Sequence, residues 1–385
     1  MASANKKKIM IGIFVAVVAL IVVRMVTMET DVNLVTTFSV PDGVALDTVG
    51  QKVTDRWAAA VDGKFVVGND EESVQATAST TKMILALAVL EKKPIEKDSN
   101  GEKITITNEM YDRYAWYIAN NGSNTAVKIG EEISEYDALV STMLKSSNNM
   151  ADALAIWAFG SIEEYQKYAT EMIRSWGLEK TTLGKKDASG YDESTTSTAK
   201  ELAIIGYKVM QHPILSEIVA KKEAEVPVAG KISNTNLLLG KSGISGVKTG
   251  YIGEASGYCI VSGYKIGEHI FTVALLNADS RNKSFNENFE VVEDLQNKLV
   301  SSILISKGDE VGYYESWWTG KVLVKASEDF SEVNYKGLET KSEILVNVLK
   351  VRMGEKEYDV ALDVPDFARS PSIFERFLHI FGWKK

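Results

Sequence analysis

The chain has 385 residues, of which 45% are hydrophobic and 25% charged, which is typical of two or three globular domains and excludes wholesale disorder, a collagen-like fibre and a polytopic membrane protein. Acidic residues outnumber basic ones by 52 to 43, so no basic field exists to hold a nucleic-acid backbone, and we expect no nucleic-acid partner. The single cysteine, Cys259, excludes an internal disulfide framework and any CxxC site, and the three histidines lie far apart in the sequence. We therefore expect neither a metal nor a cofactor.

Residues 1–30 carry the pattern of a signal peptide or a membrane anchor. Three lysines at positions 6–8 precede an uncharged apolar run from Ile9 to Val23, which lengthens to Met28 if Arg24 reaches the membrane surface. A membrane span needs about 20 residues, so length does not separate the two alternatives. The lack of a small-x-small cleavage site favours an uncleaved anchor. Because the lysines precede the run, we expect the rest of the chain at the outer face of the cytoplasmic membrane.

The first folded elements are predicted at Trp57–Val67 and Ser79–Glu91. The first segment places Asp62-Gly63 between two apolar runs, which is typical of a β-hairpin with a two-residue turn. The second segment is nearly all apolar after its first turn, which predicts a helix buried on all sides. Lys82 is an anomaly in such a helix.

Ser79 and Lys82 form the first pattern with chemical meaning, Ser-x-x-Lys. A spacing of three residues places the hydroxyl and the amine on one face of a helix. A serine hydroxyl needs an adjacent base, and burial lowers the pKa of a lysine so that it can serve as one. The N–H groups at the helix start can stabilise an oxyanion. The same spacing follows Ser3, Ser197 and Ser245, where a simple capping role is the commoner interpretation, and of these four serines only Ser79 starts a buried helix.

The middle of the chain, after the predicted β-hairpin, is expected to be mainly helical. Amphipathic helices are predicted at about Tyr136–Lys145, Met150–Phe159, Ile162–Trp176 and Thr198–Met210. Strands are predicted at about Gly246–Thr249, Gly257–Gly263 and Ile270–Leu276, and a helix at Phe289–Ser301. Strands at both ends with helices between them imply a sheet closed by pairing of strands that are distant in sequence. Short alternating strands from about Ser306 to Val364 predict a small all-β domain.

The loop before Met150 holds a second pattern, Ser146-Ser147-Asn148-Asn149. A hydroxyl and an amide two residues apart can point into one cleft, where they relay a proton and hold a substrate amide. Ser146 with Asn148 and Ser147 with Asn149 both fit this spacing. Taken alone, such a segment is more commonly a helix N-cap.

Lys248-Thr249-Gly250 ends an apolar strand and forms a third pattern. An ammonium and a hydroxyl lie on neighbouring positions, and the glycine lets a ligand approach the backbone. Such a strand edge can bind a peptide as an added strand, with Lys248 and Thr249 recognising its carboxylate. An ordinary strand-end lysine before a turn is the alternative. The near-duplicate Lys241-Ser242-Gly243 lies in a turn-like segment, so we favour Lys248.

Residues 370–385 are predicted to form an amphipathic helix that starts at Ser370-Pro371. At about 100° per residue, one arc of this helix is apolar and the opposite arc is polar. The apolar arc holds Ile373, Phe374, Phe377, Leu378, Ile380 and Phe381. Its aromatic residues and the terminal lysines favour a helix at a membrane surface. A terminal helix docked on the protein's own core is the alternative.

Each of the three patterns is common alone, but together, in this order, on a helix start, a loop and a strand, they resemble the signature of the penicillin-recognising serine enzymes. Within that group the sequence resembles the serine D-alanyl-D-alanine carboxypeptidases, the low-molecular-weight penicillin-binding proteins. Segments that look like family segments include Ala78–Met83, Ser197–Ala203, Gly246–Tyr251 and Gly257–Val261. The resemblance covers roughly residues 45–301.

The resemblance implies an α/β (α+β) catalytic domain of the serine β-lactamase/transpeptidase type, with an antiparallel sheet and a helical cluster. It also implies a small C-terminal all-β domain and an amphipathic tail. The domains expected are an N-terminal signal or anchor at 1–30, the catalytic domain at 45–301, the small β domain at 302–366 and the amphipathic helix at 370–385.

The resemblance also implies site residues at the matching positions. They are Ser79, Lys82 and Ser147 for catalysis and Asn149, Lys248, Thr249, Gly250 and Tyr251 for substrate binding. Ser79 would be acylated, with Lys82 as its general base. Ser147 and Asn149 are assigned to the second motif because the family has an acidic residue and then an alanine after Ser-x-Asn, and Ala151 fits that alanine.

The third motif would bind the substrate's terminal carboxylate through Lys248 and Thr249. The backbone N–H groups of Ser79 and Tyr251 would form the oxyanion hole. The chain departs from the family in two ways. Met150 stands in place of the usual acidic residue, and the aligned downstream stretch at 286–289 lacks the family's arginine, with Arg281 and Lys283 nearby.

The function implied is a D,D-carboxypeptidase outside the cytoplasmic membrane. Ser79 would attack the D-Ala–D-Ala carbonyl of a peptidoglycan stem peptide, D-alanine would leave, and water would hydrolyse the acyl-enzyme. Penicillin and other β-lactam antibiotics would acylate the same serine. A D,D-endopeptidase and a class A-like β-lactamase are alternatives of the same fold, although Glu163 and Glu164 lie in a helical segment rather than a deacylating loop. A catalytically idle cell-wall binding protein is a further alternative.

Overall fold

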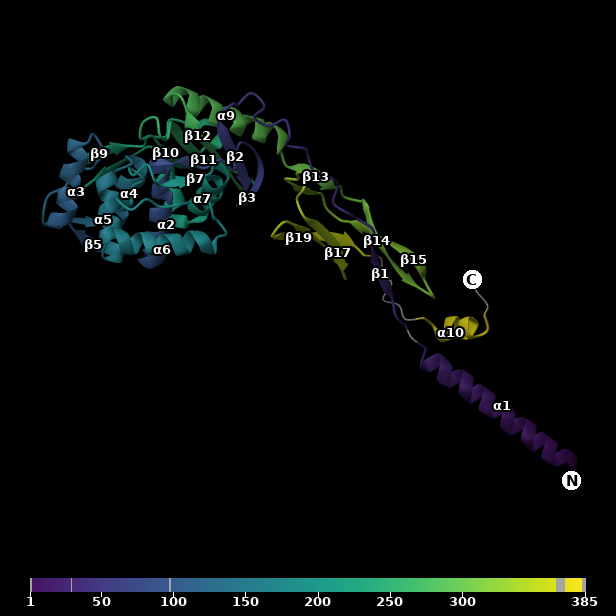
Figure 1. The fold of residues 1–385 in the computed structure, drawn as a ribbon. Coiled ribbons are helices and arrows are strands. Elements are labelled where there is room, and N and C mark those ends of the chain that lie inside the picture. The colour runs from purple at the N-terminus through teal and green to yellow at the C-terminus, as the bar shows by residue number, and fades with distance from the viewer. Residues whose placement is uncertain (1, 29, 97, 365–370, 383–385) are drawn as a thin grey trace. The chain divides into compact units, whose positions relative to one another are not determined.

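The structure is a computed structural model that describes residues 2–28, 30–96, 98–364 and 371–382, with side chains from residue 10 onward (Figure 1). Two compact units are present. One unit is Ala45–Val300, and the other combines the residues up to Val44 with those from Ser301 onward.

A five-stranded antiparallel sheet forms the centre of the larger unit. Its order is β10 (Gly246–Gly250), β11 (Tyr258–Ile266), β12 (His269–Ala278), β2 (Arg56–Val61) and β3 (Lys64–Asn69). The predicted hairpin is confirmed, because β2 and β3 pair across Asp62 and Gly63, both of which have positive φ. The predicted non-local closure is also confirmed, since β2 pairs with β12, about 200 residues later in the chain. At the other end of the sheet, β10 is an edge strand.

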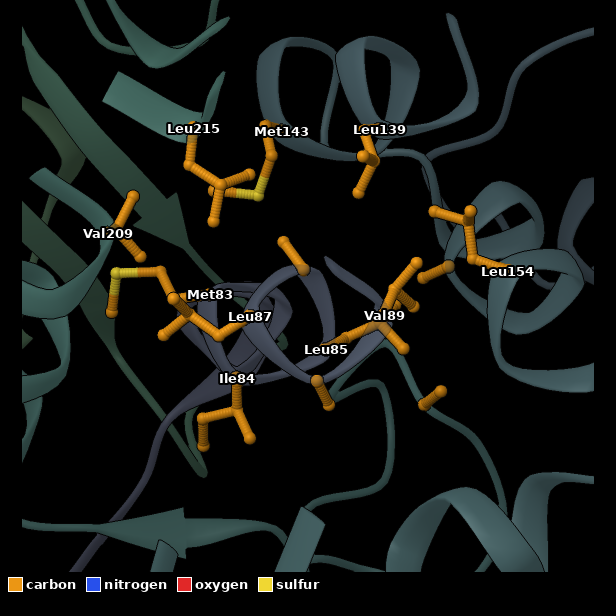
Figure 2. Close-up of a cluster of buried hydrophobic side chains, with 14 of the residues drawn as sticks. Met83, Ile84, Leu85, Leu87, Val89, Leu139, Met143, Leu154, Val209 and Leu215 are labelled. Carbon is orange, nitrogen blue, oxygen red and sulfur yellow. The ribbon is translucent and has the colours of Figure 1, made fainter. Parts of the chain in front are cut away.

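The helix α2 (Lys82–Lys92) lies at the centre of the helical cluster. All its residues from Lys82 to Leu90 are buried, so the predicted fully buried helix is confirmed. Figure 2 shows its side chains packed among those of Leu139, Met143 and Leu154 from neighbouring helices. The surrounding helices are α4 (Glu135–Leu144), α5 (Asn148–Phe159), α6 (Ile162–Ser175), α7 (Ala199–Gln211) and α8 (Pro213–Ala220).

Helices cover both faces of the sheet. On one face Gly206 of α7 lies against Val261 of β11, and its missing side chain permits this close packing. On the other face α9 (Arg281–Lys298) inserts Asn288, which bonds to Ser262 and to the Val273 carbonyl oxygen. This helix begins eight residues before the predicted start, because Ser280 caps it through the N–H of Lys283.

Several short elements complete the larger unit. The helix α3 (Asn108–Ala119) was not predicted from the sequence, because it has few aliphatic residues and buries only Met110 and Tyr117. The short strand pairs are β4 (Gln75–Ala76) with β7 (Thr196–Ser197), β5 (Lys103–Thr105) with β6 (Glu132–Ser134), and β8 (Glu223–Val226) with β9 (Gly230–Ser233).

The smaller unit is mainly a six-stranded antiparallel sheet. Its order is β1 (Asn33–Thr36), β14 (Glu310–Ser316), β15 (Gly320–Ala326), β19 (Lys356–Asp363), β18 (Val348–Met353) and β17 (Thr340–Leu345), and β13 (Ser302–Ile305) pairs with β16 (Phe330–Glu332). The predicted all-β region is therefore present, but the sequence did not predict its first strand. β1 precedes the larger unit in the chain and pairs with β14, about 280 residues later.

Two helices accompany the smaller unit, α1 (Ala2–Val26) and α10 (Ile373–Ile380). Ser372 and Glu375 form a capping box that starts α10. The helix begins at Ile373, three residues after the predicted start at Ser370, which lies outside the described residues. Across the part of the chain that the structure describes, no helix combines the length and the apolar character that crossing a membrane requires.

Candidate active site

Ser79 and Lys82 meet where the 3-10 turn Ala78–Thr81 leads into α2. Lys82 Nζ lies 2.7 Å from Ser79 Oγ, as the spacing of three predicts. The same nitrogen lies 2.7 Å from Asn148 Oδ1 and 2.9 Å from the carbonyl oxygen of Ser189. The Lys82 side chain is fully buried, so these three oxygens fix its orientation.

Two glycines allow other segments to come close to the turn that holds Ser79. A Cβ on Gly250, at the end of β10, would lie 3.0 Å from the backbone nitrogen of Ser79 and 3.0 Å from the Thr77 carbonyl oxygen. A Cβ on Gly190 would lie 2.2 Å from the Ala78 carbonyl oxygen, and Gly190 also has a positive φ of 76°. A side chain at Gly190 would therefore clash with the turn, and one at Gly250 would crowd the backbone of Ser79 and Thr77, which favours the glycine of Lys-Thr-Gly.

Burial sets the protonation of the two lysines at the site. It lowers the pKa of Lys82 to about 7, although the charges of Asp187 and Asp152 act in the opposite direction. The pKa of Lys248 falls well below its ordinary value, first because the side chain is buried and second because Lys82 is close. An amine that is neutral near pH 7 can accept a proton from a hydroxyl.

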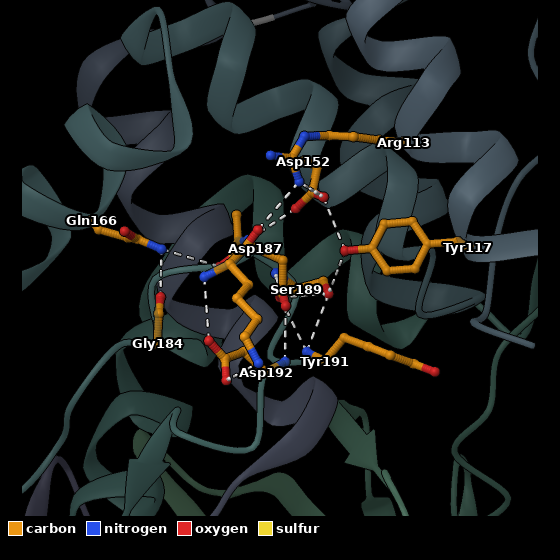
Figure 3. A network of polar contacts seen from close by, with 11 residues as sticks. Arg113, Tyr117, Asp152, Gln166, Gly184, Asp187, Ser189, Tyr191 and Asp192 are labelled. Atoms are coloured by element: carbon orange, nitrogen blue, oxygen red, sulfur yellow. Dashed lines mark hydrogen bonds and ion pairs between the residues drawn. The ribbon is translucent and has the colours of Figure 1, made fainter. Parts of the chain in front are cut away.

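A buried polar network holds the segment that contacts Lys82 (Figure 3). Asp187 accepts hydrogen bonds from the backbone N–H and the hydroxyl of Ser189, each at 2.8 Å, and from the backbone N–H of Asp192. Asp152 accepts from the backbone N–H of Ala188 at 2.8 Å. These bonds fix the Ser189 carbonyl oxygen against Lys82.

Asp152 itself is fully buried, and two side chains of α3 also bond to it. Its Oδ2 lies 2.7 Å from Arg113 Nη1 and 2.9 Å from the Tyr117 hydroxyl, which donates to it. Burial raises the pKa of Asp152 to about 6, with Arg113 opposing the rise and Asp187 adding to it. Patterns in the sequence did not identify this network, because its members are distant in the chain.

The structure brings Ser146 and Asn148 to the Ser79 cleft and Lys82, rather than the pair Ser147 and Asn149 assigned from the sequence. Ser147 Oγ donates to Asn149 Oδ1 at 2.8 Å, and Asn149 bonds both backbone groups of Thr125, so this pair is part of the buried structure. Asn148 instead contacts Lys82, and Ser146 lines the cleft that contains Ser79. Neighbouring residues at the start of α5 point in directions about 100° apart, so only one asparagine can face the cleft.

We expect the two asparagines to respond differently to alanine. Asn148→Ala removes an acceptor from Lys82 Nζ and should slow acylation by penicillin on the order of 10²-fold. Asn149→Ala leaves three buried hydrogen-bonding groups unpaired and should instead lower the free energy of unfolding by about 1–3 kcal/mol. Acylation rates and urea midpoints measure the two effects. If a folded Asn149→Ala protein were acylated slowly and Asn148→Ala at the normal rate, the second motif would instead be Ser147 with Asn149.

A cleft of about 290 Å³ contains Ser79 and brings the third motif to it. Besides Ser79, its lining includes Ser146, Thr235, Thr249, Gly250, Tyr251, Tyr258 and Arg281. Thr249 Oγ1 lies 2.7 Å from Thr235 Oγ1, and Arg281 Nη2 donates to the Thr235 carbonyl oxygen at 3.3 Å. Arg281 therefore supplies a cation at this end of the cleft. The sequence showed only that Arg281 lies near residues 286–289, where the family has its arginine.

The other predicted residues take different positions around the cleft. Lys248 is buried and donates to the Thr249 carbonyl oxygen at 3.1 Å, and Tyr251 is exposed and stacks on Tyr258 with ring centroids 4.1 Å apart. Glu163 and Glu164 both pair with Lys167 on the exposed face of α6, and neither lines the cleft of Ser79. In the described ranges, no group of three or more potential ligands is arranged to hold a metal ion.

The fold and this constellation together define the penicillin-binding class of serine enzymes. The family model described as D-alanyl-D-alanine carboxypeptidase, peptidase S11, matches residues 57–280. The chain therefore belongs to this family of serine-type D-alanyl-D-alanine carboxypeptidases, which confirms the fold class and the enzyme class predicted from the sequence.

Relatives and solved structures agree with this assignment. The D-alanyl-D-alanine carboxypeptidase DacF of Bacillus subtilis is 24% identical over 309 residues, which cover 75% of this chain and 76% of that protein. A D-alanyl-D-alanine endopeptidase of Pseudomonas aeruginosa is 25% identical over 248 residues, covering 63% and 76%. The peptidoglycan synthesis regulatory factor PBP3 of Streptococcus pneumoniae shares the fold, with a TM-score of 0.64 at 16% identity over 85% of this chain and 99% of that one.

Proposed function

We propose that Ser79 removes the terminal D-alanine of peptidoglycan stem peptides through an acyl-serine intermediate. Ser79 Oγ attacks the carbonyl carbon of the D-Ala–D-Ala bond, and its proton passes to Lys82 Nζ. The C–N bond then breaks, the proton goes to the departing amine of D-alanine, and a water molecule hydrolyses the ester. The observation that carries this proposal is the set of three oxygens around Lys82 Nζ.

The identity of these three oxygens supports a general-base role for Lys82. A neutral amine has two N–H groups and one lone pair. The Ser189 carbonyl oxygen and Asn148 Oδ1 are acceptors, so they take the two N–H groups. The lone pair is then left facing the Ser79 hydroxyl, which is the group that must lose a proton.

The other end of the cleft suits a carboxylate. Thr249, Thr235 and Arg281 supply hydroxyls and a guanidinium there, and the buried Lys248 donates to the Thr249 carbonyl oxygen. Because β10 is an edge strand, a peptide can add to it as a further strand with its terminal carboxylate at this end. The close approach of Gly250 to the Ser79 nitrogen supports the proposal that the backbone N–H groups of Ser79 and Tyr251 bind the oxyanion.

A D,D-endopeptidase is the second candidate, because two relatives with that name match 63% and 51% of this chain. The two activities differ in the group on the leaving side of the scissile bond, so two substrates separate them. The protein should release free D-alanine from a monomeric peptide ending in D-Ala–D-Ala, and penicillin should block the release. Cleavage of cross-linked dimers without D-alanine release would favour the endopeptidase, and no turnover of either substrate by folded protein would contradict both.

We also propose that the enzyme works at the outer face of the cytoplasmic membrane, held by the N-terminal segment and by α10. The exposed Ile373 and Phe374, together with the lack of any buried side chain in α10, support a lipid contact over docking on the protein's own core. The full chain should sediment with membranes, and removal of residues 1–28 and 371–385 should release it. Equal sedimentation of both forms would contradict the proposal.

A further inference from the structure

The smaller unit has an aromatic turn between β14 and β15. Residues 316–320 form this turn, and Trp317 and Trp318 at its tip are both partly exposed. Their rings lie edge to face with centroids 5.4 Å apart. The backbone N–H of Thr319 donates to Ser316 Oγ at 3.1 Å and closes the turn. Two adjacent tryptophans are an unusual choice for a turn, where small polar residues are common. We call residues 316–320 the Trp turn.

The Trp turn contacts α10 on the polar side of that helix. The ring of His379 stacks on Trp317 with centroids 4.3 Å apart. Arg376 donates from Nη1 to the Met25 carbonyl oxygen at 2.7 Å, in the last turn of α1 (Figure 1). At about 100° per residue, His379 and Arg376 both lie opposite the apolar arc of α10. The helix is therefore attached by its polar arc, which is the reverse of a helix docked on a core.

The apolar arc of α10 lies open on the other side. Ile373 is 76% exposed, Phe374 67% and Phe381 46%. A partner that covers this arc must be apolar, and it must also reach the last turn of α1, because Arg376 holds α10 there. A lipid bilayer that contains the N-terminal segment meets both requirements, since its surface lies where that segment ends.

We propose that the Trp turn is a membrane-contacting element and forms one lipid-facing surface with α10 and the end of α1. This inference rests on the proposed membrane location. Tryptophan favours the headgroup level of a bilayer, because its ring is apolar and its N–H is polar. Lys321, directly after the turn, is exposed, lies 3.9 Å from the centre of the Tyr313 ring and adds a cation for anionic headgroups. The small β unit then rests on the lipid surface.

A fluorescent label in the Trp turn tests the proposal in the full chain. The single native cysteine, Cys259, is buried, so a cysteine introduced by Trp318→Cys can be labelled selectively with a nitrobenzoxadiazole dye. The protein is reconstituted into vesicles of phosphatidylcholine and phosphatidylglycerol. The emission should shift to shorter wavelength, and a nitroxide on the lipid headgroup should quench it.

A label at Glu355→Cys provides the matched control. Glu355 is exposed in the turn between β18 and β19 of the same unit. β19 pairs with β15 only at Lys325 and Ala326, the end of β15 away from the Trp turn, and its earlier residues continue further away. We expect headgroup nitroxides to quench the label at Trp318→Cys roughly two- to fivefold more strongly than the label at Glu355→Cys. Equal quenching of the two labels would overturn the proposal.

A second label keeps both tryptophans in place. Thr319→Cys should give the same quenching, and adding Trp317→Ala and Trp318→Ala should reduce it several-fold. Trp116→Ala removes an exposed tryptophan of the larger unit and should leave the quenching unchanged. None of these variants lies in the cleft of Ser79, so D-alanine release from a soluble peptide should stay at the wild-type rate.

The remaining outcomes separate this inference from the proposed function. A shifted emission that no lipid nitroxide quenches would show that protein, such as a second copy of this chain, covers the Trp turn, and would overturn the proposal. Sedimentation of the full chain with the vesicles but without quenching would overturn this inference alone. Failure to sediment would overturn the proposed membrane location and this inference with it, whereas D-alanine release tests the proposed reaction separately.

Discussion

Replacing Ser79 by alanine is expected to abolish covalent labelling by penicillin and to reduce D-alanine release on the order of 10⁴- to 10⁶-fold. The effect is large because no bond can form between the substrate and an alanine side chain, so the acyl-enzyme route is lost entirely. The fold should remain, since Ser79 is only partly buried and its side chain bonds to Lys82. Mass spectrometry after incubation with penicillin measures the adduct, and circular dichroism checks the fold.

Ser245 provides a matched control for this experiment. It also precedes a lysine by three residues, but it lies just before β10 rather than at the start of a buried helix. Ser245→Ala should therefore keep the wild-type mass shift with penicillin. A penicillin adduct that persists in Ser79→Ala would show that another residue is the nucleophile.

Replacing Lys82 by alanine is expected to slow acylation on the order of 10²- to 10⁴-fold, because the Ser79 hydroxyl loses its base. The pH dependence gives a sharper test. The pKa of Lys82 is lowered by burial to about 7, and only the neutral amine can accept the proton. Acylation by penicillin should therefore fall as pH drops below 7, by about tenfold per unit, and reach a plateau above about pH 8.

Two variants test whether protonation of Lys82 causes this fall in the acylation rate below pH 7. Lys82→Arg keeps a positive charge that cannot be removed in this pH range, so it should stay inactive from about pH 5 to 9. Lys200→Ala, which removes the lysine of another Ser-x-x-Lys pattern, should keep the wild-type profile because Lys200 pairs with Glu72 at the surface. A wild-type rate that is flat between about pH 5 and 8 would contradict the general-base role of Lys82.

The parts of the site that lie within one element were predictable. The spacing of Ser79 and Lys82 along a helix brings the two side chains together whatever the rest of the fold does. The apolar run after them predicted burial, and burial lowers the pKa of Lys82. The pairing of β2 with β3 likewise depends on a turn of two residues.

The parts that depend on distant segments were not predictable in the same way. Asn148 and Ser189 contact Lys82 across 66 and 107 residues, and no periodicity in the sequence encodes such a distance. The choice of Asn148 over Asn149 depends on the direction in which α5 leaves its loop, and a shift of one residue turns a side chain by about 100°. The Ser-x-Asn spacing alone fits both Ser146 with Asn148 and Ser147 with Asn149.

The sequence by itself determined the buried helix, the Ser-x-x-Lys pair and the Lys-Thr-Gly strand, because each depends on the local geometry of one helix or strand. Only the tertiary structure decided which asparagine faces Lys82, that Arg281 lines the cleft and that the Ser189 carbonyl oxygen orients the amine. The cavity between α3 and the loop of residues 186–193 also arises only in the folded chain, since these two segments are about 70 residues apart. Contacts of this kind depend on how the core packs the elements together, and packing is a property of the whole unit.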